Sequence, residues 1–263
     1  MRVSDIVLIS LSIFLSQCTS SPLNRKQVTL YSEGEMASRG DSVYRAIKES
    51  TAVSAKSETV DYVNCVAENL ILGLDDTAKL KFIWEITTFK DPQINAFALP
   101  GGKIGVYEGL LGVADNQHQL AAVLAHEIGH VLAQHGNERA SQAAIRDLGV
   151  LAAQALGVSE MTVKAIDTSA QIGLLLPFSR IQESEADKIG LQLMAKTGFD
   201  PLESLVFWQK MAENKSRGAP ELLSTHPSPQ SRIETLQTLM SSAEKTWVDS
   251  RKSGKNPDCI FVN

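Results

Sequence analysis

Apolar side chains recur at helical spacing over much of this chain. Between residues 57 and 72 they fall at Val60, Val63, Ala67 and Leu70, and Gly73 follows as a helix stop signal. Further helices are predicted over residues 117–135, 138–178, 180–198, 200–212 and 228–245. Most of the chain is therefore expected to be helical.

Two short stretches, 94–99 and 103–107, flank the turn-forming residues 100–102 and predict a β-hairpin. Residues 81–89 are rich in β-branched and aromatic side chains and predict another strand. Together with the helices, these strands predict an α+β fold that is mainly helical and contains a small sheet.

The predicted helix 117–135 contains the sequence His126-Glu127-Ile128-Gly129-His130. Positions i and i+4 share one face of a helix, so both imidazoles can reach one metal ion. Glu127 then lies beside the open coordination position, where a carboxylate can accept a proton from water. The alternative is a helix whose two histidines only pack or cap. The pattern predicts a zinc hydrolase site.

A catalytic zinc site needs a third protein ligand. Glu183 and Asp187 are again spaced i, i+4 on a predicted helix, so Glu183 can bind the metal while Asp187 hydrogen-bonds a ligand histidine. Glu185 points to another face and is expected to be solvated. His135 is rotated away from the metal and is expected to end its helix near Gly136. A charged helix face without any metal is the alternative for the acidic cluster.

These motifs resemble the zinc metallopeptidase family that contains the CAAX prenyl endopeptidases and the HtpX-type heat-shock proteases. The resemblance covers about residues 95–232, and it is greatest for the soluble branch of small bacterial periplasmic lipoprotein peptidases. The matching blocks are residues 95–102, 124–130, 183–187 and 225–227 with Arg232. The resemblance implies a zincin-like (gluzincin) fold.

The resemblance also implies a role for each matching residue. It gives one zinc ion per chain, bound by His126, His130 and Glu183, with Glu127 as the general base and Asp187 as the partner of a ligand histidine. His226 and Arg232 match residues near the metal. His226 is expected either to stabilise the oxyanion or to block the metal transiently. Its alternative is a loop histidine before Pro227.

In the same family an edge strand lies over the active-site helix, and a substrate peptide can pair with such a strand through its backbone. The substrate-cleft candidates are therefore Asn95, Ala96, Phe97 and Ala98. A purely structural hairpin explains the same residues.

The N-terminus has the features of an export signal. An apolar core runs from Ile6 to Leu15, and Cys18 follows in a lipobox-like context, although Asp5 and Gln17 depart from the usual pattern. Residues 1–17 are predicted to be a signal peptide, 18–40 a tether and 41–263 a single peptidase domain. Lipidation of Cys18 would place the protein in the periplasm, anchored to the outer membrane. Ordinary cleavage nearby, which releases a free periplasmic protein, is the alternative.

Cys65 and Cys259 are the cysteines that remain in the predicted domain, and an oxidising compartment favours a disulfide between them. Two separate thiols are the alternative. The net charge is −5 and no basic cluster is present, so nucleic acid is not an expected partner.

The predicted function is zinc-dependent hydrolysis of internal peptide bonds in unfolded or misfolded polypeptides. The expected location predicts that these are misfolded or unassembled proteins of the cell envelope. A different class is a zinc-stabilised, chaperone-like binding module whose peptidase activity is latent or incidental. Glu127 argues against that class, because a structural zinc site needs no base.

Overall fold

Helix α6 (Gln117–Leu132) lies at the centre of the fold, and every residue from Gln119 to Val131 is buried. The computed structural model describes residues 18–155, 178–214, 221–226 and 229–261. The Asn116 side chain caps α6 by accepting hydrogen bonds from the backbone N–H groups of His118 and Gln119. The site motif therefore sits on a helix with no solvent-exposed face.

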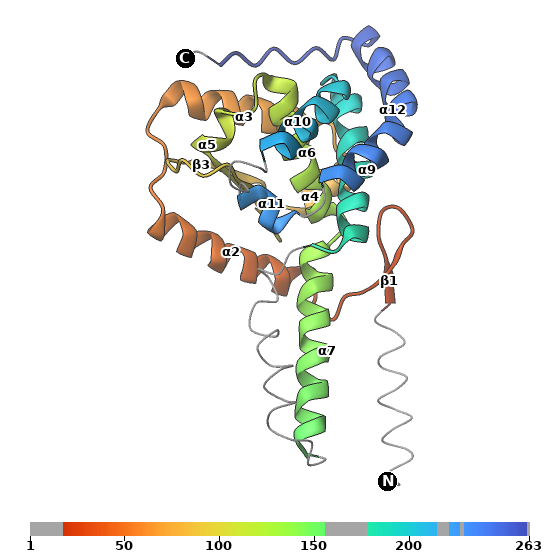
Figure 1. The fold of residues 1–263 in the computed structure, drawn as a ribbon. Coiled ribbons are helices and arrows are strands. Elements are labelled where there is room, and N and C mark those ends of the chain that lie inside the picture. Colours follow the sequence, from red (N-terminus) through yellow and green to blue (C-terminus); the bar gives the residue numbers. More distant parts are fainter. Residues whose placement is uncertain (1–17, 156–177, 215–220, 227–228, 262–263) are drawn as a thin grey trace.

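Helix α6 ends three residues earlier than expected. The backbone of Gln134 is left-handed (φ 54), which turns the chain sharply, and helix α7 (His135–Ala155) starts at the next residue. Helix α7 extends away from the body of the molecule (Figure 1). His135 is thus at the start of a new helix, and its expected position at the end of α6 is wrong.

Several helices surround α6, and α9 makes the most extensive contact with it. Helices α3 and α10 also pack on α6, and α12 packs on α9 and α10. The remaining helical bounds are α2 (Glu33–Ser50), α3 (Ser57–Leu72), α4 (Asp76–Lys81), α5 (Glu108–Leu111), α9 (Arg180–Thr197), α10 (Leu202–Asn214), α11 (Glu221–Thr225) and α12 (Pro229–Lys252).

Glycines allow α6 and α9 to cross at close range. A Cβ atom on Gly129 would lie 2.9 Å from the carbonyl oxygen of Ala186, and one on Gly190 would lie 2.9 Å from the backbone of Ala125 and His126. Real Cβ atoms essentially never approach other atoms so closely. The missing side chains therefore set the distance between the helix that carries the two site histidines and the helix that carries Glu183.

The central sheet has the strand order β3-β5-β4, with β3 (Glu85–Phe89), β4 (Ala96–Leu99) and β5 (Lys103–Tyr107). Strands β4 and β5 pair antiparallel, which confirms the predicted hairpin. Gly101 and Gly102 have φ values of 91° and 86°, a region that glycine adopts without strain. Strand β4 packs on α6 and is an edge of this sheet within the described chain. The strand expected over 81–89 starts only at Glu85, and α4 occupies residues 76–81.

The expected tether over residues 18–40 is folded. Strands β1 (Cys18–Ser20) and β2 (Lys26–Val28) form an antiparallel hairpin, and α2 starts at Glu33. We call residues 18–28 the N-terminal hairpin. Arg25 ties it to Glu138 and Glu185, two buried carboxylates of α7 and α9. The local composition predicts a tether because it gives no sign of Glu138 and Glu185, the distant residues that hold the hairpin in place. The expected signal peptide lies outside the described residues.

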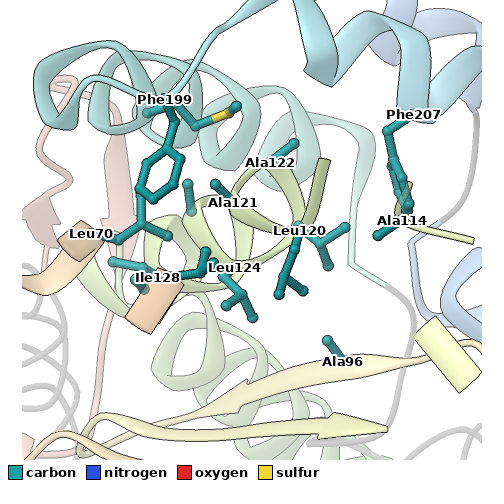
Figure 2. Packing of buried hydrophobic residues seen from close by; sticks show 14 of the residues in the cluster. Leu70, Ala96, Ala114, Leu120, Ala121, Ala122, Leu124, Ile128, Phe199 and Phe207 are labelled. Atoms are coloured by element: carbon teal, nitrogen blue, oxygen red, sulfur yellow. The ribbon is translucent and has the colours of Figure 1, made fainter. Parts of the chain in front are cut away.

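The hydrophobic core gathers apolar side chains of α3, α6, α9 and α10 with those of the sheet. Figure 2 shows Leu120, Leu124 and Ile128 of α6 between Leu70 of α3 on one side and the strand that carries Ala96 on the other. Among the described helices, none has both the length and the apolar composition that crossing a membrane would require.

A disulfide joins Cys65 of α3 to Cys259 of the C-terminal tail, with 5.7 Å between their Cα atoms. This is the pairing that the sequence favours. The bond closes a loop of 194 residues, so it connects the first and last parts of the core.

Candidate metal centre

His126 and His130 lie one turn apart on α6, and their Nε2 atoms are 3.0 Å from each other. Glu183 comes from the first turns of α9, with Oε1 3.4 Å from Nε2 of His130 and Oε2 3.5 Å from Nε2 of His126. All three side chains are buried. The close crossing of α6 and α9 therefore brings together the three expected ligands.

His226, which follows α11, completes a group of four. Its Nδ1 atom lies 3.0 Å from Oε1 of Glu183 and 3.2 Å from Nε2 of His126. The candidate ligand atoms of His126, His130, Glu183 and His226 all lie within 4.8 Å of one another. Sequence reasoning named His226 without fixing its place, and the structure puts it inside the cluster.

The donor set fits zinc. Three imidazoles and one carboxylate offer nitrogen and oxygen ligands that Zn²⁺ accepts. Oε2 of Glu183 is buried and accepts no hydrogen bond among the described residues, although Nη1 of Arg232 lies 3.3 Å away. A buried carboxylate oxygen without a hydrogen bond is costly, and a bound cation would satisfy it. Burial also lowers the pKa of His130 well below its usual value, so this imidazole is neutral and able to bind a metal.

Glu127 lies beside the cluster and is also buried. Its Oε1 atom is 3.3 Å from Nε2 of His226 and has no hydrogen-bond partner in the described part of the chain. Its Oε2 atom accepts a hydrogen bond of 3.1 Å from the backbone N–H of Ala98. One oxygen is thus held by strand β4, and the other faces the centre.

Asp187 and Arg232 support the outer side of His126. Oδ1 of Asp187 is 3.0 Å from Nδ1 of His126, on the side of the ring away from the cluster. The Arg232 guanidinium pairs with Asp187 at 2.5 Å and stacks on the Trp208 ring at 3.4 Å. Burial alone would raise the pKa of Asp187, but Arg232 and His126 hold it below its ordinary value. Nη2 of Arg232 also lies 2.8 Å from Nδ1 of His126, so the buried Asp187 anion and Arg232 together contact the outer side of this ring.

Neighbouring side chains affect Glu183 in the same way. Burial disfavours its charged form, but His226, Arg232 and His126 outweigh that effect and hold the pKa of Glu183 well below its usual range. Sequence reasoning did not assign Arg232 a role. The structure shows that its side chain, only 2% exposed, supplies charge to both carboxylates.

The four cleft candidates on and beside β4 face in different directions. The Phe97 side chain points into an aromatic cluster with Tyr44, Phe89 and Tyr107. Asn95 accepts a hydrogen bond from the Tyr107 backbone on the β5 side. Ala98 turns its N–H outward to Glu127, and by the alternation of an antiparallel strand Ala96 faces the same way. The cleft side of β4 therefore consists of the backbone of Ala96 and Ala98.

A pocket adjoins the cluster between β4, α2 and the start of α7. Its apolar walls are the side chains of Met36, Phe82, Leu99 and Phe178. Phe178 stacks on the His130 ring with 3.7 Å between ring centroids. This aromatic residue, which sequence reasoning missed, lines the pocket together with His130.

Two further residues near the centre differ from expectation. His135, expected to face away from the metal, has its Nδ1 atom 2.8 Å from Nδ1 of His130. Glu185, expected to be solvated, is buried and accepts hydrogen bonds from Arg25 and Ser21. Burial would raise the pKa of Glu185, but His135, Ser21 and Arg25 lower it to about 2. The sequence around His135 and around Glu185 gives no sign of these contacts.

Curated proteins that resemble this chain are metalloendopeptidases and proteases. The mitochondrial metalloendopeptidase OMA1 of Schizosaccharomyces pombe is 40% identical over 189 residues, which are 71% of this chain and 54% of that protein. The mitochondrial metalloendopeptidase OMA1 of Bos taurus is 37% identical over 222 residues, 76% of this chain and 41% of that protein. The β-barrel assembly-enhancing protease of Escherichia coli is 30% identical over 210 residues, 76% of this chain and 42% of that protein. The chain spans about half the length of these relatives.

This comparison contradicts the expected location in a periplasm with an anchor in the outer membrane. Several relatives that match most of the chain are named as mitochondrial enzymes. A short apolar segment followed by a cysteine is a weak signal, and here Asp5 and Gln17 weaken it further. The relatives give no support to a lipid on Cys18.

The family resemblance seen in the sequence is confirmed. The family model for peptidase family M48 matches residues 58–240, which contain all four clustered side chains, Glu127 and Asp187. The members of this family are metallopeptidases that use zinc, in agreement with the donor set. This chain belongs to peptidase family M48.

Proposed function

We propose that this chain is a zinc-dependent endopeptidase that cleaves internal bonds of extended polypeptides. The observation that carries the proposal is the position of Glu127. Its carboxylate is buried beside a His-His-Glu donor set, with one oxygen fixed by Ala98 and the other directed to the centre without a hydrogen-bond donor in the described structure. A purely structural zinc site has no use for such a carboxylate.

The proposed roles follow from these contacts. His126, His130 and Glu183 would hold zinc, which supplies Lewis acidity to water and to the scissile carbonyl. Glu127 accepts a proton from the attacking water and delivers it to the leaving amine. Asp187, held by Arg232, accepts from Nδ1–H of His126 and keeps Nε2 of that ring directed to the centre.

The proposed substrate lies along strand β4. An extended peptide that adds to the outer edge of β4 pairs with the backbone of Ala96 and Ala98, and its scissile bond then passes Glu127. Backbone pairing is largely indifferent to side chains, which suits unfolded polypeptides. The adjoining pocket is lined mainly by apolar side chains, with Glu33 and Arg139 also in its wall, and we infer a preference for a large apolar side chain next to the scissile bond. The cell-envelope origin of the substrate is not part of this proposal, because the location on which it rested is contradicted.

We propose that His226 is a fourth zinc donor, which competes with water and substrate for the metal. Its ring lies between Glu127 and Glu183 and reaches His126, so it fills the space that water and a scissile carbonyl need. This placement supports the blocking role over a donor to an oxyanion, since an oxyanion donor must leave that space free.

The position of His226 beside the other three donors favours one alternative function. Four protein donors complete a closed zinc site, which is typical of structural zinc. A binding module for unfolded chains, with latent peptidase activity, would have this arrangement. The presence of Glu127 separates the two functions, because only the peptidase depends on it.

The test compares the wild type with Glu127→Gln, which keeps the size of the side chain and removes the base. Zinc content is measured by metal analysis, and cleavage by an unfolded fluorescent casein substrate with and without chelator. We expect one zinc per chain in both proteins, chelator-sensitive cleavage by the wild type and loss of turnover in the variant. Full zinc-dependent cleavage by Glu127→Gln would refute the assignment. Zinc binding without cleavage by either protein would support the binding module.

A further inference from the structure

A chain of hydrogen bonds leads from the metal centre to the N-terminal hairpin. Nδ1 of His130 is 2.8 Å from Nδ1 of His135, and Nε2 of His135 is 3.1 Å from Oε2 of Glu185. Arg25 donates its Nε–H to the same Glu185 oxygen at 2.5 Å. His135 is fully buried, with an exposed fraction of 0%. Residues far apart in sequence thus form one continuous path.

Only one arrangement of protons along this path is compatible with metal binding. His130 directs Nε2 to the cluster, and that atom binds a cation only without a proton. The proton of the neutral ring is then on Nδ1, and within the described residues His135 accepts it. His135 accepts at Nδ1, keeps its own proton on Nε2 and donates it to Glu185.

Glu185 is a suitable end point because its position is fixed. Ser21 and Arg25 donate to it, and Arg25 is itself held by two hydrogen bonds to Glu138, of 2.7 Å and 2.8 Å. A bidentate arginine–carboxylate pair of this kind is geometrically specific. Gln182 of α9 also donates to Glu138 at 2.7 Å. The end of the path is therefore anchored on α7, α9 and the N-terminal hairpin together.

We propose that His135 is a positioning residue for the metal ligand His130, and that the N-terminal hairpin holds it in place through Arg25 and Glu185. His126 meets a carboxylate directly, through Asp187, whereas His130 meets one through a second imidazole. Partners of this kind fix the ring orientation and the protonated nitrogen of a ligand histidine, and their loss costs about 10–100-fold in metal affinity. The inference rests on the proposed assignment of His130 as a ligand.

The test measures zinc affinity in the whole chain by competition with a chromophoric chelator. We expect His135→Leu to weaken zinc binding by about 10–100-fold. His135→Asn should weaken it less, because its side-chain oxygen can still accept from His130. Arg25→Met and Glu185→Gln should each weaken it by about 10-fold. The matched control is Arg45→Met, which removes an exposed arginine paired with Asp41 and should leave zinc affinity unchanged.

Two further measurements separate positioning from a structural role. In a double-mutant cycle, Arg25→Met should have little additional effect on zinc affinity in the His135→Leu background, because the path is already broken. Nuclear magnetic resonance of the zinc-loaded wild type should show His130 protonated on Nδ1 and His135 on Nε2. This measurement needs no variant, so it decides the matter even if a variant fails to fold.

The outcomes distinguish this inference from the proposed function. Unchanged zinc affinity in His135→Leu, or a His135 proton on Nδ1 in the wild type, would overturn the positioning role while zinc-dependent cleavage by the wild type stands. Additive effects of the Arg25 and His135 substitutions would overturn the link to the hairpin. A wild type that binds no zinc at all would instead refute the proposed function.

Discussion

The glycines between α6 and α9 lead to a quantitative prediction. Gly190→Ala places a Cβ atom 2.9 Å from the backbone of Ala125 and His126, whereas ordinary van der Waals contact starts at 3.4 Å. Backbone atoms inside a helix cannot rotate away, so the two helices must separate. Overpacking of this kind costs about 1–3 kcal/mol, and the better helix propensity of alanine offsets up to about 1 kcal/mol. We expect a net loss of about 1–2 kcal/mol in the free energy of unfolding.

The separation of the helices also moves Glu183 away from the two histidines of α6. A displacement of about 1 Å at a reacting centre can lower the rate by about 10²-fold, so we expect a loss of activity and of zinc affinity well beyond the loss of stability. Thermal unfolding without metal, chelator competition for zinc and peptidase kinetics measure the three effects separately.

Gly149→Ala is the matched control, because Gly149 is exposed on α7 and its Cβ would meet nothing within 4 Å. This substitution should stabilise the protein by up to about 1 kcal/mol and leave zinc affinity unchanged. If Gly190→Ala stabilises the protein as Gly149→Ala does, and zinc affinity stays at the wild-type value, the reasoning about the helix crossing is refuted.

Three other predictions concern the disulfide and the centre. Replacing Cys65 and Cys259 by alanine should lower the free energy of unfolding by up to about 5 kcal/mol, as measured by urea denaturation; no change on reduction of the wild type would contradict this. Arg232→Ala should cost about 3–5 kcal/mol because it removes the cation that pairs with the buried Asp187 and Glu183, and calorimetry that shows less than 1 kcal/mol would disprove the importance of that pairing. His226→Ala should raise peptidase activity if this ring blocks the site, whereas lower activity would assign it to the oxyanion and unchanged kinetics would remove it from the mechanism.

Local sequence signals predicted a large part of the fold. Helix α3 has the predicted bounds because its apolar spacing and Gly73 both lie within the segment itself. Helix α9 ends as expected because Gly198 adopts the left-handed conformation (φ 87) that terminates helices. Asn116 caps α6 through its own side chain. In each case the cause lies within a few residues of the effect.

The parts of the site that sequence reasoning missed depend on distant partners. Glu185 has the local features of a solvated residue, but Arg25 and Ser21, which bury it, lie about 160 positions earlier. His135 faces His130 only because the left-handed backbone of Gln134 reverses the chain, and a glutamine gives no sign of this conformation. Glu183 was predicted because its i, i+4 spacing to Asp187 is local, while its distances to His126 and His130 required the structure.

The spacing of the clustered side chains along the chain has a consequence for biosynthesis. His226 lies 100 residues after His126 and 43 after Glu183. A ribosome-bound chain that has emerged only as far as α7 contains His126 and His130 but lacks both Glu183 and His226. The proposed set of three zinc ligands is therefore incomplete in such a chain, and it is assembled only after synthesis has passed Glu183.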